Sequence, residues 1–136
     1  MSSKLHLDYL KNHPEYKVYQ HADMYHFNTD TCLLGEYLKI NKDEKVLDVG
    51  TNNGALLVYI INKGGIATGI EINQEALKVC KLTLQENNLS ATLINQDFKD
   101  YQSKELFDVI VSNPPFFDNL EEKELSQNEN KRIARH

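Results

Sequence analysis

Metal-binding clusters, long apolar runs and an excess of basic residues are all missing from this sequence of 136 residues, and each absence excludes a class of protein. The five histidines are scattered without the spacing of metal ligands, so we predict no metal site. Fifteen Lys and Arg oppose twenty Asp and Glu, and the net charge of −5 is not typical of a nucleic-acid-binding protein. No signal peptide, repeat, low-complexity segment or membrane-spanning run is visible, so no membrane partner is predicted.

Cysteine is also scarce. The two cysteines, Cys32 and Cys80, lie within apolar helical patterns and lack the spacing of a pair of metal ligands. We therefore expect reduced thiols in the core and a cytoplasmic protein. With 40% apolar residues, the chain has enough hydrophobic material for the core of one domain.

Short apolar segments alternate with segments of helical periodicity along most of the chain. The pattern predicts helices from Ala55 and from Gln74, and strands at residues 45–50, 66–71, 91–94 and 107–111. Strands that alternate with helices form a parallel sheet, so an α/β fold is indicated. Ligands of such sheets bind outside the carboxyl ends of the strands.

A glycine-bearing loop joins the first of these strands to the first helix. Gly50 and Gly54 bracket the loop, and Asn52 stands where the dinucleotide fingerprint G-x-G-x-x-G has its second glycine. Asn tolerates a positive φ, so the turn still forms, and backbone N–H groups at the helix start point toward a ligand. Asp48 precedes the loop, and a carboxylate there repels phosphate and attracts a cation. The loop therefore favours a cationic cofactor, and S-adenosylmethionine, with its sulfonium and ammonium groups, is the candidate.

Acidic residues end the next two strands as well. Glu71 lies about twenty residues after the glycine loop, where an acidic residue of a βαβ unit accepts hydrogen bonds from both ribose hydroxyls. We assign Ile72, the next residue, to the same site. Asp97 is placed to accept from an adenine amino group, with Phe98 beside the ring. The alternative is that each carboxylate caps a helix or is a solvated charge.

The sequence Asn113-Pro114-Pro115-Phe116 follows the fourth predicted strand and is the candidate catalytic turn. Its prolines fix their own φ angles and keep the preceding residue out of the helical region. The carbonyl oxygens of the Asn113 side chain and of Pro114 are acceptors for a planar –NH2 group, and Phe116 offers a flat face for stacking. Asn113 is also assigned to the cofactor site. The alternative is a strand-ending turn with a core Phe.

These motifs together resemble those of class I S-adenosylmethionine-dependent methyltransferases that methylate amino groups. The matching positions are residues 48–54, Glu71, residues 97–98 and residues 113–116. Two flanking segments resemble bacterial tRNA(Val) adenine-N6 methyltransferases more narrowly. They are Phe27-Asn28-Thr29-Asp30-Thr31-Cys32-Leu33-Leu34 before the sheet and Lys131-Arg132-Ile133-Ala134-Arg135-His136 after the catalytic turn.

The resemblance implies a Rossmann-like α/β fold with a mainly parallel seven-stranded sheet and helices on both faces. Only four core strands are found, so we expect the N-terminal part of a longer protein. Residues 1–40 are expected to form a cap, in which Thr29 or Asp30 closes over the methionine end of the cofactor. Residues 41–136 are expected to form the cofactor-binding core, incomplete at its C-terminus. An uncovered sheet edge favours a homodimer.

Three functions remain open at this point. The narrower resemblance implies methyl transfer from S-adenosylmethionine to the exocyclic amino group of adenine in tRNA. A glutamine side-chain amide of a translation factor is the second substrate, although about forty residues before the first strand are too few for the helical domain of that family. The third reading is a cofactor-binding fragment without activity. The basic residues Lys131, Arg132 and Arg135 belong either to a contact with RNA or to a solvated tail.

Overall fold

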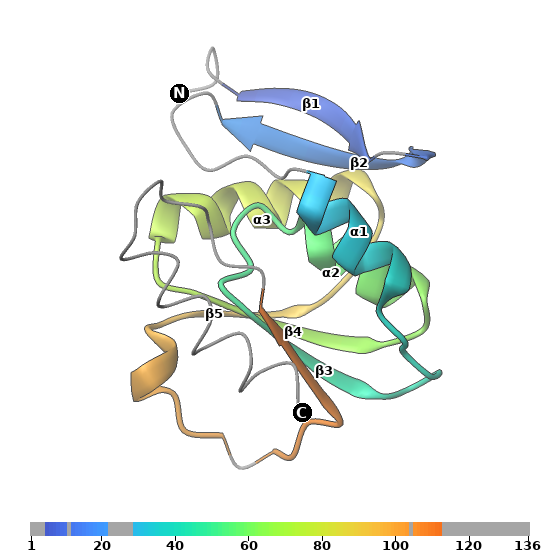
Figure 1. The fold of residues 1–136 in the computed structure, drawn as a ribbon. Helices are drawn as coiled ribbons and strands as arrows, with labels where there is room; N and C mark the ends of the chain where they lie inside the picture. The colour runs from blue at the N-terminus through green and yellow to red at the C-terminus, as the bar shows by residue number, and fades with distance from the viewer. Residues whose placement is uncertain (1–4, 11, 22–28, 104, 113–136) are drawn as a thin grey trace, which may run out of the picture.

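The computed structural model describes residues 5–10, 12–21, 29–103 and 105–112. Within these ranges the chain forms a β-hairpin, three α-helices and a parallel sheet (Figure 1). The predicted catalytic turn, residues 113–116, lies outside the described residues, as do Phe27, Asn28 and the basic C-terminal segment.

Four parallel strands form the central sheet, in the order β5-β4-β3-β6. They are β3 (Lys45–Val49), β4 (Ile66–Glu71), β5 (Thr92–Asn95) and β6 (Val109–Ser112). The strands agree with the predicted segments within two residues at each end, and the helices α2 (Ala55–Asn62) and α3 (Gln74–Glu86) begin at the predicted residues. The predicted α/β fold with a parallel sheet is confirmed.

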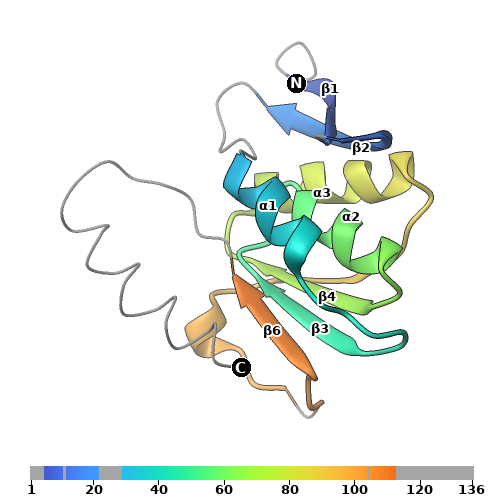
Figure 2. The ribbon, with the colours of Figure 1, turned by 45° about the vertical axis from the view of Figure 1, so that its right-hand side comes forward.

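All three α-helices of the described part lie on one face of this sheet (Figure 2). The crossovers β3-α2-β4 and β4-α3-β5 step along the sheet in the same direction, so right-handed connections place both helices on the same side. Helix α1 (Thr29–Tyr37) packs against α2. The connection from β5 back to β6 runs along the other face and includes the 3₁₀ helix η2 (Phe98–Asp100). Helices on both faces therefore stay a prediction for residues outside the described ranges.

The core lies between the sheet and its helices. It consists of apolar side chains from β3, β4, β6, α2 and α3: Val46, Leu56, Leu57, Ile60, Ala67, Leu77, Cys80, Leu84 and Val111. Both cysteines are buried and free, in keeping with the expectation of core thiols. Within the described residues, no helix has the length and apolar character needed to cross a membrane.

A β-hairpin covers the helices on the side away from the sheet (Figure 1). Its strands β1 (Leu5–Leu10) and β2 (His13–His21) are antiparallel, and β2 packs against α3. Leu10 and Val18 are buried in a second apolar cluster with residues of α1 and α2. The sequence analysis predicted a cap over residues 1–40 but assigned no helix or strand within it. The boundary at residue 40 stays a prediction.

Candidate functional site

The carboxyl ends of β3 and β6 form the topological switch point of the sheet. From β3 the chain proceeds outward to β4 and β5 and then returns to the opposite side of β3 as β6. Open α/β sheets bind ligands at such a point, outside the carboxyl ends of the strands. The glycine loop, residues 50–54, follows β3 and leads into α2.

Three residues of the glycine loop have positive φ angles: 75° at Gly50, 50° at Asn52 and 87° at Gly54. Where a Cβ would stand at Gly50, no heavy atom of the described residues lies within 4 Å. At Gly54, by contrast, an added Cβ would meet Cys80 Sγ at 2.9 Å. Gly54 therefore permits close packing of the loop on α3, whereas Gly50 leaves open space beside the backbone.

Asp48 lies beneath this loop and is only 1% exposed. Thr51 Oγ1 donates to Asp48 Oδ2 at 2.7 Å. Burial, together with the nearby charge of Glu71, raises the pKa of Asp48 to about 7, although the hydrogen bond from Thr51 opposes the shift. Asp48 thus holds the loop through Thr51, and near neutral pH it carries only part of the negative charge that the sequence suggested. Its contact with a cofactor stays a prediction.

Glu71 organises the loop from the end of β4. Its Oε1 accepts from the backbone N–H of Asn52 at 2.8 Å, and its Oε2 accepts from that of Asn73 at 3.0 Å. Each carboxylate oxygen retains a second acceptor position, so hydrogen bonds from ribose hydroxyls remain possible in addition. Ile72, the next residue, is 65% exposed and presents an apolar side chain beside this carboxylate.

Two asparagines that the sequence analysis did not single out also shape this edge. Asn73 caps α3 by accepting from the backbone N–H of Ala76. Asn95 Nδ2 donates to the backbone oxygens of Glu71 and Ile72 at 2.9 and 3.1 Å and so fixes the turn after β4. For Asn73 the available signal was an Asn shortly after a predicted strand and directly before a predicted helix, which is typical of an N-cap.

Asp97 has a structural role in the described part of the chain. Its Oδ1 accepts from the backbone N–H of Lys99 at 3.0 Å, so it is the N-cap of η2, as the alternative interpretation stated. Lys99 Nζ lies 3.8 Å from Asp97 Oδ2. Phe98 is 43% exposed. Their contact with adenine stays a prediction.

The remaining predicted site residues are only partly described. Thr29 begins α1, and Asp30 is an exposed acidic residue in its first turn. Their closure over the methionine end of the cofactor stays a prediction. The predicted catalytic turn begins at Asn113 and lies outside the described residues; Ser112, the last residue of β6, pairs with Val49 at the end of β3.

The described residues suit a cofactor such as S-adenosylmethionine. Asn52 Oδ1 is buried without a hydrogen-bond partner in the described part of the chain, and an unpaired buried acceptor costs about 1–3 kcal/mol. A ligand with ammonium or hydroxyl donors removes that cost. The open space at Gly50 and the carboxylate of Glu71 complete a cradle for a ligand that carries donors. No metal-binding cluster occurs among the residues described.

The fold is that of the Rossmann-like class I methyltransferases. The T. thermophilus 16S rRNA N2 G1207 methyltransferase, solved with AdoMet and guanosine, superposes with a TM-score of 0.70 at 22% identity. The superposition covers 84% of this chain and 33% of the other. S-adenosylmethionine, the predicted cofactor, is confirmed as the cofactor of this class.

The chain belongs to the methyltransferase small domain family, whose model matches residues 15–132. It is 33% identical to the tRNA1(Val) (adenine(37)-N6)-methyltransferase of Aliivibrio fischeri over 113 residues, which are 80% of this chain and 47% of that protein. It is also 33% identical to the release factor glutamine methyltransferase of Flavobacterium psychrophilum over 103 residues, or 71% of this chain and 35% of that protein. The chain thus spans half or less of the length of these relatives.

Proposed function

We propose that this chain binds S-adenosylmethionine and serves methyl transfer to an amino nitrogen of tRNA. The observation on which this proposal depends is the hydrogen bond from the backbone N–H of Asn52, in the glycine loop, to Glu71 near the switch point. Glu71 and Asn52 accept hydrogen bonds from the cofactor, and the space at Gly50 admits it beside the backbone. The bound cofactor supplies a methyl group activated by its sulfonium. The other residues orient the reactants and exclude water.

The proposed acceptor is the exocyclic amino group of adenine. Its lone pair is delocalised into the ring, so two acceptors on its hydrogens draw the nitrogen toward tetrahedral geometry. We assign these roles to Asn113 Oδ1 and the Pro114 carbonyl, with Phe116 stacked on a base that has left its own stack. The support is the Asn-Pro-Pro-Phe sequence after β6 and the similarity to tRNA1(Val) adenine-N6 methyltransferases. The proposed location is the cytoplasm, where its tRNA substrate is found.

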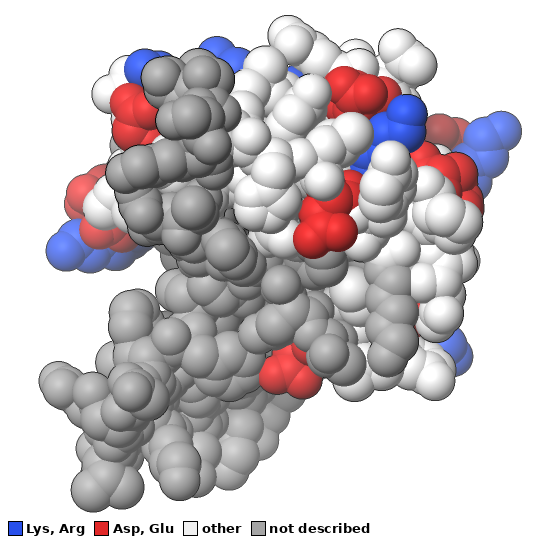
Figure 3. All heavy atoms as spheres, turned by 90° about the horizontal axis from the view of Figure 1, so that it is seen from above, with Lys and Arg blue, Asp and Glu red and all other residues white. Residues whose placement is uncertain are grey.

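A glutamine side-chain amide is the second candidate acceptor. It presents the same planar –NH2 group, and the similarity to a release factor glutamine methyltransferase favours it specifically. Figure 3 shows Lys and Arg side chains on the hairpin side separated by acidic and uncharged residues, so this face of the described part lacks the basic stripe expected for RNA. The proposed tRNA contacts therefore lie on other surfaces.

Two measurements test these proposals separately. Calorimetry with S-adenosylhomocysteine tests cofactor binding, and an absence of binding by the folded chain would refute it. Tritium transfer from labelled cofactor to bulk tRNA, against a purified release factor, identifies the acceptor. Label in the tRNA supports adenine as the acceptor. Label in the release factor would instead identify the glutamine side-chain amide as the acceptor. Cofactor binding without either label identifies a cofactor-binding fragment.

A further inference from the structure

Asn53 connects the glycine loop to the N-terminal hairpin. The residue is 4% exposed and lies between the two positive-φ positions Asn52 and Gly54. Its Nδ2 donates to the backbone oxygen of Tyr19 on β2 at 3.1 Å. Its Oδ1 accepts from the backbone N–H of Ala55, at the start of α2, at 3.3 Å. One side chain therefore joins the loop to both the helix that follows it and a strand distant in sequence.

The strand that receives this bond is itself fixed to α3. Thr83 Oγ1, on a fully buried side chain, accepts from the backbone N–H of Tyr19 at 3.0 Å. Asn87, the C-cap of α3, accepts from the N–H of Lys17 at 2.9 Å and donates to its carbonyl at 2.6 Å. The backbone N–H of Tyr19 thus bonds to α3, and its backbone oxygen accepts from the glycine loop. Strand β2 forms a bridge from one to the other.

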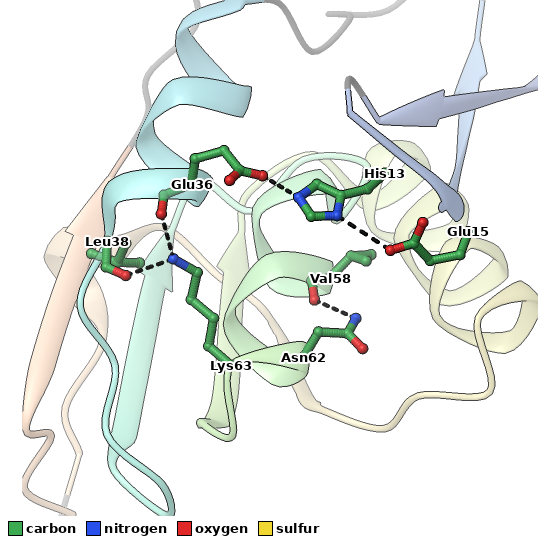
Figure 4. Close-up of polar contacts among 7 residues, drawn as sticks. All are labelled: His13, Glu15, Glu36, Leu38, Val58, Asn62 and Lys63. Atoms are coloured by element: carbon green, nitrogen blue, oxygen red, sulfur yellow. Dashed lines mark hydrogen bonds and ion pairs between the residues drawn. The ribbon is translucent and has the colours of Figure 1, made fainter.

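The turn of the hairpin has an anchor of its own on α1. His13 bonds to Glu36 of α1 through Nε2 and to Glu15 through Nδ1, as Figure 4 shows. Its ring stacks on Tyr16 at 4.5 Å between centroids and meets Tyr59 of α2 edge-on at 5.7 Å. The hairpin is therefore held at two separate places, and the position of the Tyr19 carbonyl is well defined.

We propose that Asn53 is a positioning residue for the cofactor. Through the hydrogen bond from Asn53 to Tyr19, the β1–β2 hairpin becomes a functional part of the cofactor site. The inference rests on the proposed cofactor-binding function. A loop with three positive-φ residues has many accessible conformations when unsupported, and ordering it on binding lowers affinity. The bond from Asn53 to the docked hairpin orders the loop before the cofactor arrives. The backbone at Gly50 and the amide of Asn52 then meet the ligand without that cost.

Replacing Asn53 by Asp tests the link directly. The carboxylate still accepts from the N–H of Ala55 but cannot donate to the carbonyl of Tyr19. We expect affinity for S-adenosylhomocysteine, measured by calorimetry, to fall about three- to tenfold. Asn62→Asp is the matched control, since Asn62 Nδ2 donates to the Val58 carbonyl at 2.8 Å near the far end of the same helix (Figure 4). Its affinity should equal that of the unmodified chain.

A double-mutant cycle distinguishes coupling through the hairpin from a local effect. Asn87→Ala removes the bonds to Lys17 at a distance from the loop, and we expect it to weaken S-adenosylhomocysteine binding as well. When Asn53→Asp has already broken the link, adding Asn87→Ala should weaken binding little further. Should Asn53→Asp fail to fold by circular dichroism, Asn53→Ser takes its place, because the hydroxyl caps α2 but is too short to reach Tyr19.

The outcomes separate this inference from the function on which it rests. No binding of S-adenosylhomocysteine by the unmodified chain refutes the proposed function itself. Binding by the unmodified chain with equal affinity in the folded Asn53 variant refutes the positioning role. Weakening by Asn53→Asp and Asn87→Ala that multiplies in the double variant shows two independent effects and overturns the coupling through β2.

Discussion

At the scale of single residues, carboxylates and amides at the strand ends form bonds within the protein before any ligand is bound. Glu71 accepts hydrogen bonds from two backbone N–H groups, Asp48 accepts one from the hydroxyl of Thr51, and Asp97 caps η2. Structural and ligand-binding roles are compatible because each carboxylate oxygen accepts more than one hydrogen bond. Variants at these positions are therefore expected to change both stability and cofactor affinity.

Glu71→Ala should weaken the binding of S-adenosylhomocysteine by about 1.5–3 kcal/mol, the range for hydrogen bonds to a charged group. It should also lower Tm, because two backbone N–H groups lose their acceptor. Calorimetry and thermal unfolding measure the two effects. Glu75→Ala is the control, since it removes an exposed carboxylate of α3 that pairs with Lys78 of the same helix. An unchanged dissociation constant in Glu71→Ala would remove Glu71 from the cofactor site.

The stability of the chain should depend on pH through Asp48. The pKa of this carboxyl rises from 3.8 to about 7 on folding, so between these values the folded chain binds more protons than the unfolded chain. The free energy of unfolding must then fall as the pH rises through this range. Asp48→Asn keeps an acceptor for Thr51. We expect its stability relative to the unmodified chain to increase between pH 5 and pH 8, by an amount on the order of a few kcal/mol.

Urea unfolding at the two pH values checks this expectation. Asp100→Asn, at an exposed position of η2, controls for the general loss of one acidic charge. Equal pH dependence in the Asp48 variant and the unmodified chain would show that another group is responsible.

In a form of the protein that is active in methyl transfer, Asn113→Ala should abolish most of that activity and leave cofactor affinity nearly unchanged, since its main proposed contact is with the acceptor nitrogen. Phe116→Ala should cost about 1–3 kcal/mol in substrate binding or turnover through lost stacking. Transfer of labelled methyl groups to tRNA, together with calorimetry, measures both. Normal transfer by either variant would mean that the turn after β6 is only structural.

At the scale of elements, the hairpin depends on a titratable contact. Burial lowers the pKa of His13, but hydrogen bonds from the ring to Glu36 and Glu15 outweigh this, so the pKa lies above its ordinary value of 6.5. The stability that this contact contributes is therefore present below pH 6.5 and is lost as the pH rises through the raised pKa.

An NMR titration of the His13 ring tests that contact. We expect a pKa above 6.5 in the unmodified chain and a lower one in Glu36→Gln, which removes the charged acceptor. Glu105→Gln is the control, because that half-exposed carboxylate pairs with Lys45, on β3 rather than the hairpin. If Glu36→Gln leaves the titration unchanged, the hairpin turn is not anchored on α1 through this pair.

At the scale of the whole molecule, the described sheet has β5 and β6 at its edges, and all three described α-helices lie on one of its two faces. Unpaired strand edges and apolar faces promote association. We therefore expect this 136-residue chain to be inactive in methyl transfer and to dimerise. Light scattering and a tRNA methylation assay on the chain test this, and an active monomer would contradict it.

A lysine in place of Ile110, a half-buried residue of β6, should reduce that association, because a charge on an edge strand disfavours further pairing. Ile66→Lys is the matched control, since Ile66 is exposed at the start of the central strand β4. Equal dimerisation of the two variants would place the interface away from β6.

Local sequence determined the elements of the sheet and its helices. Apolar runs, helical periodicity and the glycine loop are short-range signals, so the strands at Lys45–Val49 and Ile66–Glu71 and the helices after them could be predicted closely. The location of the three candidate acids at the carboxyl edge of the sheet could be predicted too, because a parallel sheet brings the ends of its strands to one edge whatever their separation in sequence. Their contact with a cofactor stays a prediction.

Long-range contacts decided the rest. Alternating polar and aromatic residues at positions 5–21 gave no clear strand signal, and the hairpin is stable because Leu10 and Val18 are buried against helices that come later in the chain. Likewise, Asn53 looks like an ordinary turn residue in the sequence, and its bond to Tyr19 exists only once β2 has docked on α3. The burial of Asp48 depends on the closed loop above it. Such properties belong to the packed chain, since each requires partners that only folding brings together.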